Sequence, residues 1–178
     1  MSFDIIKLNH DSALDLAHLS RETFKEAYSE FNTEEDMALF LSTRFAIEKL
    51  IDEFNNPDFE FYGAVDSNGI LKGYLKLAIL DKYGRRGDCI ELARIYILRE
   101  AYGTRLGHQL MQKAHDRAAE FDASEIYLIV WQENEKAIRF YKKWGFEITG
   151  TQSFLLGTDL QDDFVMTKVL KNKLTSNK

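Results

Sequence analysis

Cysteine, excess basic charge and long hydrophobic runs are scarce in this sequence, and each scarcity excludes a class of protein. Its 178 residues include a single cysteine, Cys89, which excludes an internal disulfide framework and a multi-cysteine metal site. No apolar run approaches the ~20 residues that a membrane-spanning helix needs. Residues 1–12 lack the charged and apolar regions of a signal peptide. We therefore expect a cytoplasmic protein that has no membrane partner.

The charge balance is acidic, with a formal net charge of −6. Nucleic-acid binding depends on a basic face, so we expect no nucleic-acid partner. The negative charge is compatible with a cationic substrate, although solubility alone also explains a charge of this size. A hydrophobic fraction of 45% supplies enough bulk for one core. We expect one domain over residues 1–170 and a frayed tail over residues 171–178.

The N-terminal half contains both helical and strand-like periodicity. Thr33 precedes three acidic residues, and this pattern is typical of a capped helix start. The polar segment 81–88 contains glycine and predicts a loop. The remaining elements predicted in this half are a strand over 3–8, a helix from Asp11 or Ser12 to about Tyr28, a helix over 45–54, and a hairpin of strands 59–65 and 70–80.

The C-terminal half alternates between strands and helices. Residues 125–131 are nearly all apolar and are flanked by helical segments, which is typical of a buried parallel strand. Together with the hairpin, this half predicts a mixed sheet with helices on both faces. Its other predicted elements are strand 89–98, helix 102–121, helix 134–144, and strands 146–149 and 164–170.

Two stretches carry residues suited to chemistry. The segment 99–111 follows a strand and opens a helix, and backbone N–H groups at such a helix start can bind a pyrophosphate. Gly103 and Gly107 would allow a close approach, although glycines at a helix start serve packing more often. In the segment 134–146, Tyr141 lies on an apolar helical face. Its hydroxyl can donate a hydrogen bond or a proton in a cleft, or the ring can simply pack in the core.

The second stretch carries a family resemblance. The segment NEKAIRFYKKWGF resembles the N-x-x-A-x-x-F-Y-x-x-x-G-F signature of the GNAT acetyltransferases. The likeness covers Ile90–Leu170 well and the N-terminal part by element order. The runs FYGAVDSNGILKGYLKL and ELARIYIL further resemble the spermidine/spermine acetyltransferase (PaiA-like) branch. The resemblance implies an α/β (α+β) fold, with a mixed, mostly antiparallel seven-stranded sheet that is flanked by helices and splayed between strands 4 and 5.

The resemblance also implies acetyl-CoA as co-substrate and assigns residues to it. The strand residues would pair with the pantetheine arm, the turn would hold the pyrophosphate, the asparagine would bind the arm, and the tyrosine would face the thioester sulfur. These residues are Ile95, Tyr96 and Ile97 in the strand; Tyr102, Gly103, Thr104, Arg105, Leu106 and Gly107 in the turn; and Asn134 and Tyr141.

For catalysis, the resemblance implies that Tyr141 is the acid and Glu91 the base, although Glu91 can equally be a solvent-facing strand residue. The implied acceptor is a primary amine, with polyamines first, then protein amines and small amines such as antibiotics. Homodimers are common in the family. The family's turn usually reads Gln/Arg-x-x-Gly-x-Gly/Ala, whereas Tyr102 and Arg105 replace its first residue and central glycine. This departure leaves a non-catalytic CoA-sensing or interaction module as the alternative. The four histidines show no metal-ligand spacing.

Overall fold

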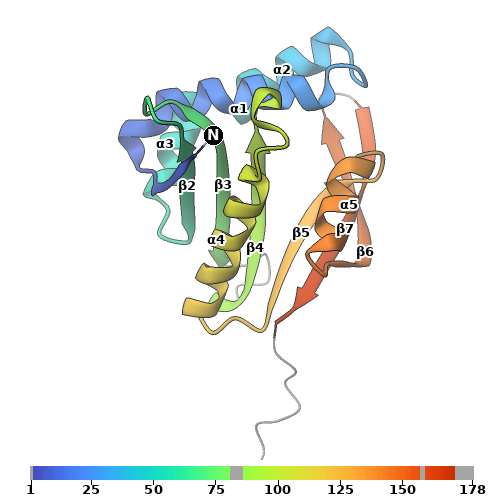
Figure 1. Ribbon diagram of the computed structural model, residues 1–178. Coiled ribbons are helices and arrows are strands. Elements are labelled where there is room, and N and C mark those ends of the chain that lie inside the picture. The colour runs from blue at the N-terminus through green and yellow to red at the C-terminus, as the bar shows by residue number, and fades with distance from the viewer. Residues whose placement is uncertain (1, 81–85, 157–158, 171–178) are drawn as a thin grey trace, which may run out of the picture.

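A computed structural model describes residues 2–80, 86–156 and 159–170 (Figure 1). Within these residues, seven strands form one sheet in the order β1-β2-β3-β4-β5-β7-β6. The strands are β1 (Asp4–Lys7), β2 (Phe59–Val65), β3 (Leu71–Leu80), β4 (Arg86–Ile97), β5 (Glu125–Trp131), β6 (Glu147–Leu156) and β7 (Asp159–Val169).

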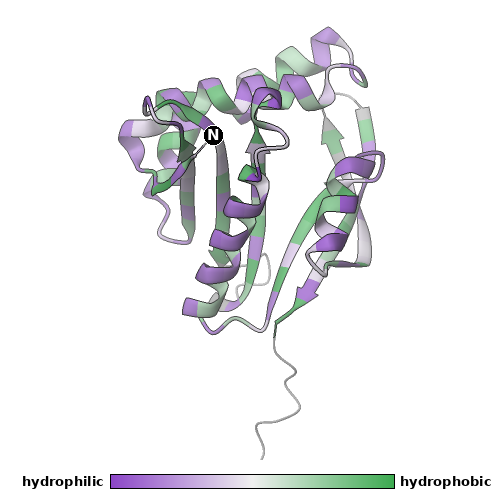
Figure 2. Ribbon diagram, in the orientation of Figure 1, coloured by the Kyte–Doolittle hydropathy of each residue, from purple (hydrophilic) through white to green (hydrophobic). Residues whose placement is uncertain are grey.

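Helices cover both faces of the sheet. Tyr74 of β3 packs in a cluster with residues of α1 and α3, whereas its neighbour Leu75 packs in another cluster with residues of α4 and α5. Because successive side chains of a strand point to opposite faces, α1 and α3 lie on one face and α4 and α5 on the other. The helices are α1 (Ala13–Tyr28), α2 (Glu34–Arg44), α3 (Ile47–Asn55), α4 (Leu106–Glu120) and α5 (Glu135–Lys143). Figure 2 shows that the outward sides of α4 and α5 are largely hydrophilic.

The sheet opens between its two central strands. The strands β4 and β5 are parallel and pair at only three positions, where Cys89–Glu91 meets Glu125–Tyr127. Beyond these pairs, β4 continues to Ile97 and β5 to Trp131, and the two strands diverge (Figure 1). The other neighbouring strands pair antiparallel. The predicted mixed sheet with a splay between its fourth and fifth strands is therefore confirmed.

The segment between α1 and α2 spans the wide end of this opening. The ring of Trp131 on β5 lies 5.0 Å from that of Phe31 and 6.0 Å from that of Tyr28, measured between centroids. The side-chain amide of Gln161 on β7 donates to Asn32 over 2.9 Å. These contacts connect the N-terminal helices to the far half of the sheet, on the face opposite α4 and α5.

Several predicted boundaries were wrong. Residues 86–88 belong to β4 rather than to a loop, since pairing with β3 extends the strand through polar residues. Helix α3 begins at Ile47 rather than at residue 45, because Phe45 leaves the helical conformation and ends α2. Helix α4 begins at Leu106, four residues later than predicted. Residues 81–85 of the predicted loop and the tail 171–178 lie outside the described residues.

The C-terminal strands also differ from their prediction. Strand β5 runs parallel to β4 over three pairs only and is antiparallel to β7 along its whole length. Strands β6 and β7 are longer than predicted, because each continues through polar residues that pair with the other strand. Cys89 is a free cysteine and is fully buried. None of the described helices is long and apolar enough to cross a membrane.

A buried ionic cluster fixes β4 to α3. Both guanidinium nitrogens Nη1 and Nη2 of Arg94 donate to the Glu53 carboxylate over 2.8 Å, and Lys76 Nζ lies 3.1 Å from it. Arg44 approaches the same carboxylate to 3.7 Å. Burial opposes the charge of Glu53, but the hydrogen bonds and charge of Arg94 hold its pKa below the ordinary value. Burial and the nearby Arg94 lower the pKa of Lys76 to about 8.

Removing the carboxylate should therefore destabilise the fold strongly. Glu53→Ala leaves three cations together without their counter-charge, and we expect the free energy of unfolding to fall by about 3–5 kcal/mol. Urea denaturation followed by circular dichroism measures this change. The control is Glu135→Ala, which breaks an exposed pair with Arg139 and should cost less than about 0.5 kcal/mol. Equal small losses in both variants would contradict a stabilising role for Glu53.

Candidate functional site

A cleft of about 650 Å³ occupies the opening between β4 and β5. Residues from α1, α2, α5, the start of α4 and the strands β4 to β7 line it. Of the predicted site residues, Thr104 alone does not border the cleft, and its hydroxyl donates instead to the carbonyl of Ala101. The predicted residues that line it are Glu91, Ile95, Tyr96, Ile97, Tyr102, Gly103, Arg105, Leu106, Gly107, Asn134 and Tyr141.

A larger hollow, about 820 Å³, lies at α1, α2 and the start of α3. Its lining includes Met37 and Leu41 with Arg21 and Glu34. None of the residues predicted for the site borders it. We place the chemistry in the cleft, where the predicted residues from four separate segments come together.

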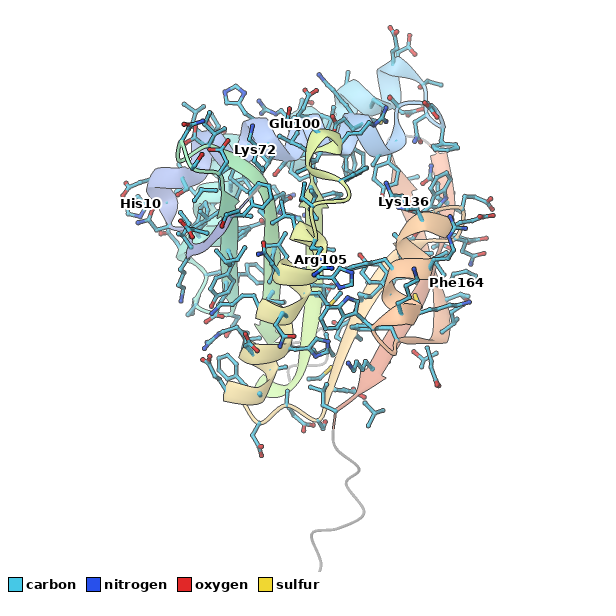
Figure 3. All side chains as sticks on the ribbon, viewed as in Figure 1. His10, Lys72, Glu100, Arg105, Lys136 and Phe164 are labelled. Atoms are coloured by element: carbon cyan, nitrogen blue, oxygen red, sulfur yellow. The ribbon has the colours of Figure 1, made fainter. Side chains whose placement is uncertain are left out.

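The start of α4 gives the cleft an end that suits an anion. The N–H groups of His108 and Gln109 donate to the carbonyl of Arg105, whereas helix geometry leaves those of Leu106 and Gly107 without an intrahelical acceptor. These free donors and the helix dipole favour a phosphate. Arg105 at the start of α4 and Lys136 in the first turn of α5 both line the cleft, from its two sides (Figure 3).

Arg105 takes the conformation that a glycine would adopt at this point of the turn. Its φ and ψ are 66° and 9°, in the left-handed region, and it precedes the first residue of α4. The preceding Gly103 also has a positive φ, of 79°, with open space around its Cα. The turn therefore has an arginine at a position that favours glycine, and the left-handed backbone conformation of this arginine costs about 1–2 kcal/mol.

Strand β4 presents unpaired backbone to the cleft. Its residues Ile95, Tyr96 and Ile97 pair with β3 on one side, and β5 has already diverged on the other. Their N–H and C=O groups on the open side can bind an extended chain in the manner of an added strand. The neighbouring Ala93 has no partner on β3, since Lys76 pairs with Arg94 and Leu77 with Leu92, so β4 bulges where the opening begins.

Tyr141 reaches the cleft from α5. The side-chain oxygen of Asn134 caps this helix by accepting from the N–H of Ala137 over 3.1 Å, and Gly145 follows its end with a φ of 84°. Tyr141 is 8% exposed and packs beside Phe146. Burial, with the nearby Tyr28, raises the pKa of its hydroxyl, which therefore keeps its proton at neutral pH. It is a hydrogen-bond donor in this site.

Glu91 lies at the narrow end of the cleft. It is the last residue of β4 that pairs with β5, and its carboxylate accepts a hydrogen bond from the Tyr127 hydroxyl over 3.0 Å. Glu91 pairs with Ala78 of β3, and Arg94 pairs with Lys76, which lies two residues before Ala78 on that strand. Residues two apart on a strand share a face, and so do directly paired residues. Glu91 therefore points to the same face as Arg94, which is the face covered by α1 and α3.

Sequence reasoning missed a carboxylate and an aromatic wall on that face. Asp163 of β7 lines the cleft and is 6% exposed, but the predicted strand began only at residue 164. Because burial and the adjacent Asp162 disfavour its charge, its pKa rises to about 6. The wall consists of the rings of Phe24, Tyr28, Phe40, Phe45 and Trp131. Its α1 members share a helical face that indicated only core packing.

Within the described residues, no group of three or more His, Cys, Asp or Glu side chains could hold a metal ion. His108 and His115 lie instead against Trp144, with ring centroids 5.6 Å and 5.1 Å from it. His115 is half-buried. Burial and the charge of Lys168 lower its pKa to about 4. It is neutral at physiological pH and serves packing.

Comparisons with known proteins agree on one family. The Acetyltransferase (GNAT) family profile matches residues 16–146. An uncharacterised N-acetyltransferase from Lactobacillus delbrueckii subsp. lactis is 33% identical, over 93% of this chain and 96% of that protein. A spermidine N(1)-acetyltransferase from Thermoplasma acidophilum is 27% identical, over 94% and 98%. The crystal structure of PaiA N-acetyltransferase from T. acidophilum in complex with coenzyme A superposes with a TM-score of 0.78 at 26% identity, covering 95% of this chain and 99% of that one.

The conformation of Arg105 has a measurable consequence for stability. Glycine has no Cβ and adopts a positive φ without strain, so Arg105→Gly should raise the free energy of unfolding by up to about 1 kcal/mol. Thermal unfolding measures the change. Arg105→Ala, which removes the charge but retains a Cβ, is the control and should not be stabilised. A stability gain in the alanine variant alone would indicate that charge, rather than backbone conformation, is responsible.

Proposed function

This chain belongs to the GNAT family of acetyl-CoA-dependent N-acetyltransferases, and on that premise we propose that it acetylates a terminal amine of a polyamine. We propose further that the amine attacks directly, with both substrates bound in the cleft between β4 and β5 and no covalent enzyme intermediate. The observation that carries the proposal is the meeting, in this one cleft, of a phosphate-binding helix start, a buried tyrosine donor and two carboxylates.

The residues on the α4 and α5 side of the cleft fit acetyl-CoA, which supplies the activated acetyl group. The free N–H groups of Leu106 and Gly107, with the charge of Arg105 and Lys136, suit its pyrophosphate. The open backbone edge of Ile95–Ile97 suits its amide-bearing arm. The structural neighbour that holds coenzyme A supports the same assignment.

The face covered by α1 and α3 fits a cationic acceptor. Aromatic rings line this part of the cleft, and the faces of such rings attract ammonium groups. Among the described residues that line the cleft, Glu91 and Asp163 are the two carboxylates, and both point to this face. The likeness to a spermidine N(1)-acetyltransferase over nearly the whole chain supports a polyamine among the amines.

Glu91 and Tyr141 have complementary roles in this proposal. A free alkylamine is mostly protonated near pH 7, so Glu91, directly or through a water, removes the proton that blocks attack. Tyr141 donates a hydrogen bond to the departing sulfur. A phenol with a raised pKa is a weaker acid than a thiol with a pKa of about 8.5, so complete proton transfer is uphill. The hydrogen bond stabilises the developing negative charge on sulfur.

CoA release from acetyl-CoA tests the function directly. We expect turnover with spermidine and spermine to exceed that with a lysine peptide and an aminoglycoside by at least tenfold. Acetyl-CoA should also raise the melting temperature, because a ligand that binds only the folded state stabilises it. Turnover confined to another amine would overturn the polyamine assignment and retain the enzyme. Neither turnover nor a shift would indicate an interaction module without cofactor.

The role of Tyr141 is tested by removing its hydroxyl alone. Tyr141→Phe keeps the ring in its packing beside Phe146, and we expect kcat to fall by roughly 10²–10³-fold, as for other lost transition-state donors. The dissociation constant for CoA, measured by calorimetry, should change by less than about threefold. The control is Tyr102→Phe, since Tyr102 lies at the pyrophosphate end. Equal kcat values in the Tyr141 variant and the parent would remove this residue from the mechanism.

A further inference from the structure

The Asp163 carboxylate is buried, and no described group compensates its negative charge. It is 6% exposed, and within the part of the chain that the structure describes it has neither an ion-pair partner nor a hydrogen-bond donor. A buried ionised carboxylate without a partner is costly, and proteins retain such a group where it is used. The proposed mechanism uses Glu91 as the base and Tyr141 as the hydrogen-bond donor, and it assigns no role to Asp163.

Strand register shows where this carboxylate points. Asp163 pairs with Trp131 of β5 and with Gln152 of β6, and directly paired residues share a face of the sheet. Trp131 contacts rings of α1 and its following turn, so Asp163 also points to the face where the acceptor enters. The charge of Asp163 contributes to the raised pKa of Tyr28, which places the two side chains close together.

Opposite charges lie on the other side of the opening. Arg94 on β4, Lys76 on β3 and Arg44 at the end of α2 gather around the single carboxylate of Glu53. This cluster is positive overall, and Arg44 and Arg94 border the cleft. In an acceptor with more than one ammonium group, the distal group is therefore repelled by this cluster and attracted to the β7 side, where Asp163 lies.

Strand β5 gives the separation of the two carboxylates. Glu91 pairs with Tyr127, and Asp163 pairs with Trp131, four residues further along the same strand. At about 3.3 Å per residue, the two positions are roughly 13 Å apart along β5. They are also roughly 10 Å apart across the sheet, because β4 and β7 flank β5 on opposite sides, so their separation is roughly 16 Å. The terminal nitrogens of extended spermidine are nine bonds apart and span roughly 11 Å, since each bond of about 1.5 Å advances a zigzag chain by only about 1.25 Å. A hydrogen bond of about 2.8 Å at each end extends the reach of spermidine to roughly 17 Å. The terminal nitrogens of putrescine, five bonds apart, span only roughly 6 Å and reach roughly 12 Å in the same way.

We propose that Asp163 binds the distal ammonium group of a polyamine whose other terminal amine is held near Glu91 for acetylation. This inference rests on the proposed function and adds to it a length requirement for the acceptor. Asp163 takes no part in the chemical step and determines specificity. The cleft selects an acceptor that is long enough for its two ends to meet the two carboxylates.

The test compares three amines in Asp163→Asn, namely spermidine, putrescine and hexylamine. We expect the ratio of kcat/KM for spermidine to that for putrescine or hexylamine to fall by roughly tenfold to hundredfold, because one charge-assisted contact is lost. The loss should appear in KM for spermidine rather than in kcat. Calorimetric titration of spermidine into the protein–CoA complex measures the same contact without turnover, and its affinity should fall by the same factor.

Asp162→Asn is the matched control, since it makes the same chemical change at the neighbouring, exposed position. It should leave the ratio unchanged. Stability provides a further readout, because a pKa of about 6 lies above the ordinary value of about 3.9 and means that ionisation disfavours the folded state. That cost is present at pH 7.5, so Asp163→Asn should raise the melting temperature.

Other outcomes would overturn the proposal. An equal loss of kcat/KM with all three amines would assign Asp163 to the chemical step or to the structure of the site. An unchanged ratio together with unchanged spermidine affinity would show that the carboxylate does not contact the substrate. A lower melting temperature would indicate a structural role. Absence of turnover with every amine, while spermidine binding still depends on Asp163, would contradict the proposed function alone.

Discussion

The divergence of β4 from β5 beyond Glu91 is the constraint on which the rest of this structure depends. Parallel pairing stops after three residue pairs, so beyond Glu91 the edges of β4 and β5 that face each other are left open, while each strand still pairs with its other neighbour. Buried backbone donors and acceptors must find partners, and an unpaired strand edge inside a protein is a binding surface for another extended chain. The opening is held by contacts on both sides. Arg94 and Glu53 fix β4 to α3, while Trp131 and Gln161 hold the far strands to the segment after α1.

This opening divides the site between the two faces of the sheet. The α4 and α5 side carries the helix-start donors, Arg105 and Tyr141, which suit the co-substrate. The opposite side carries the aromatic wall and both carboxylates, which suit the acceptor. Because the strands part, residues from both faces line one cleft, where the two substrates of the proposed reaction can be held in contact. A closed sheet with the same residues would separate them by its full thickness.

Local strain in the turn before α4 illustrates how the fold tolerates a departure from the family pattern. Arg105 occupies a left-handed conformation that favours glycine, at a cost of about 1–2 kcal/mol. The packing of α4 against β3 and β4 determines the geometry of the turn, and the arginine adopts it. This position places the charge of Arg105 at the border of the cleft, beside the free N–H groups at the start of α4. Asp163 also carries a cost. Its raised pKa reflects the unfavourable burial of a carboxylate in the half of the cleft that we propose for the acceptor.

By itself the sequence indicated the family, predicted the order of the elements and named the residues that we propose for the cofactor half of the site. Those features depend on local patterns: Thr33 caps its helix, Asn134 caps α5, and Tyr141 lies on the buried face of that helix, all within a few residues of chain. Tertiary structure alone brought together the residues that we propose for the acceptor half. Asp163 precedes the predicted strand 164–170, and only its pairing with Trp131 and Gln152, across long stretches of sequence, places it in the cleft. The ion cluster of Glu53, Lys76 and Arg94 likewise joins three elements whose charges show no pattern along the chain. Local periodicity reports which face of an element is buried, whereas strand register decides which residues share that face with a distant neighbour.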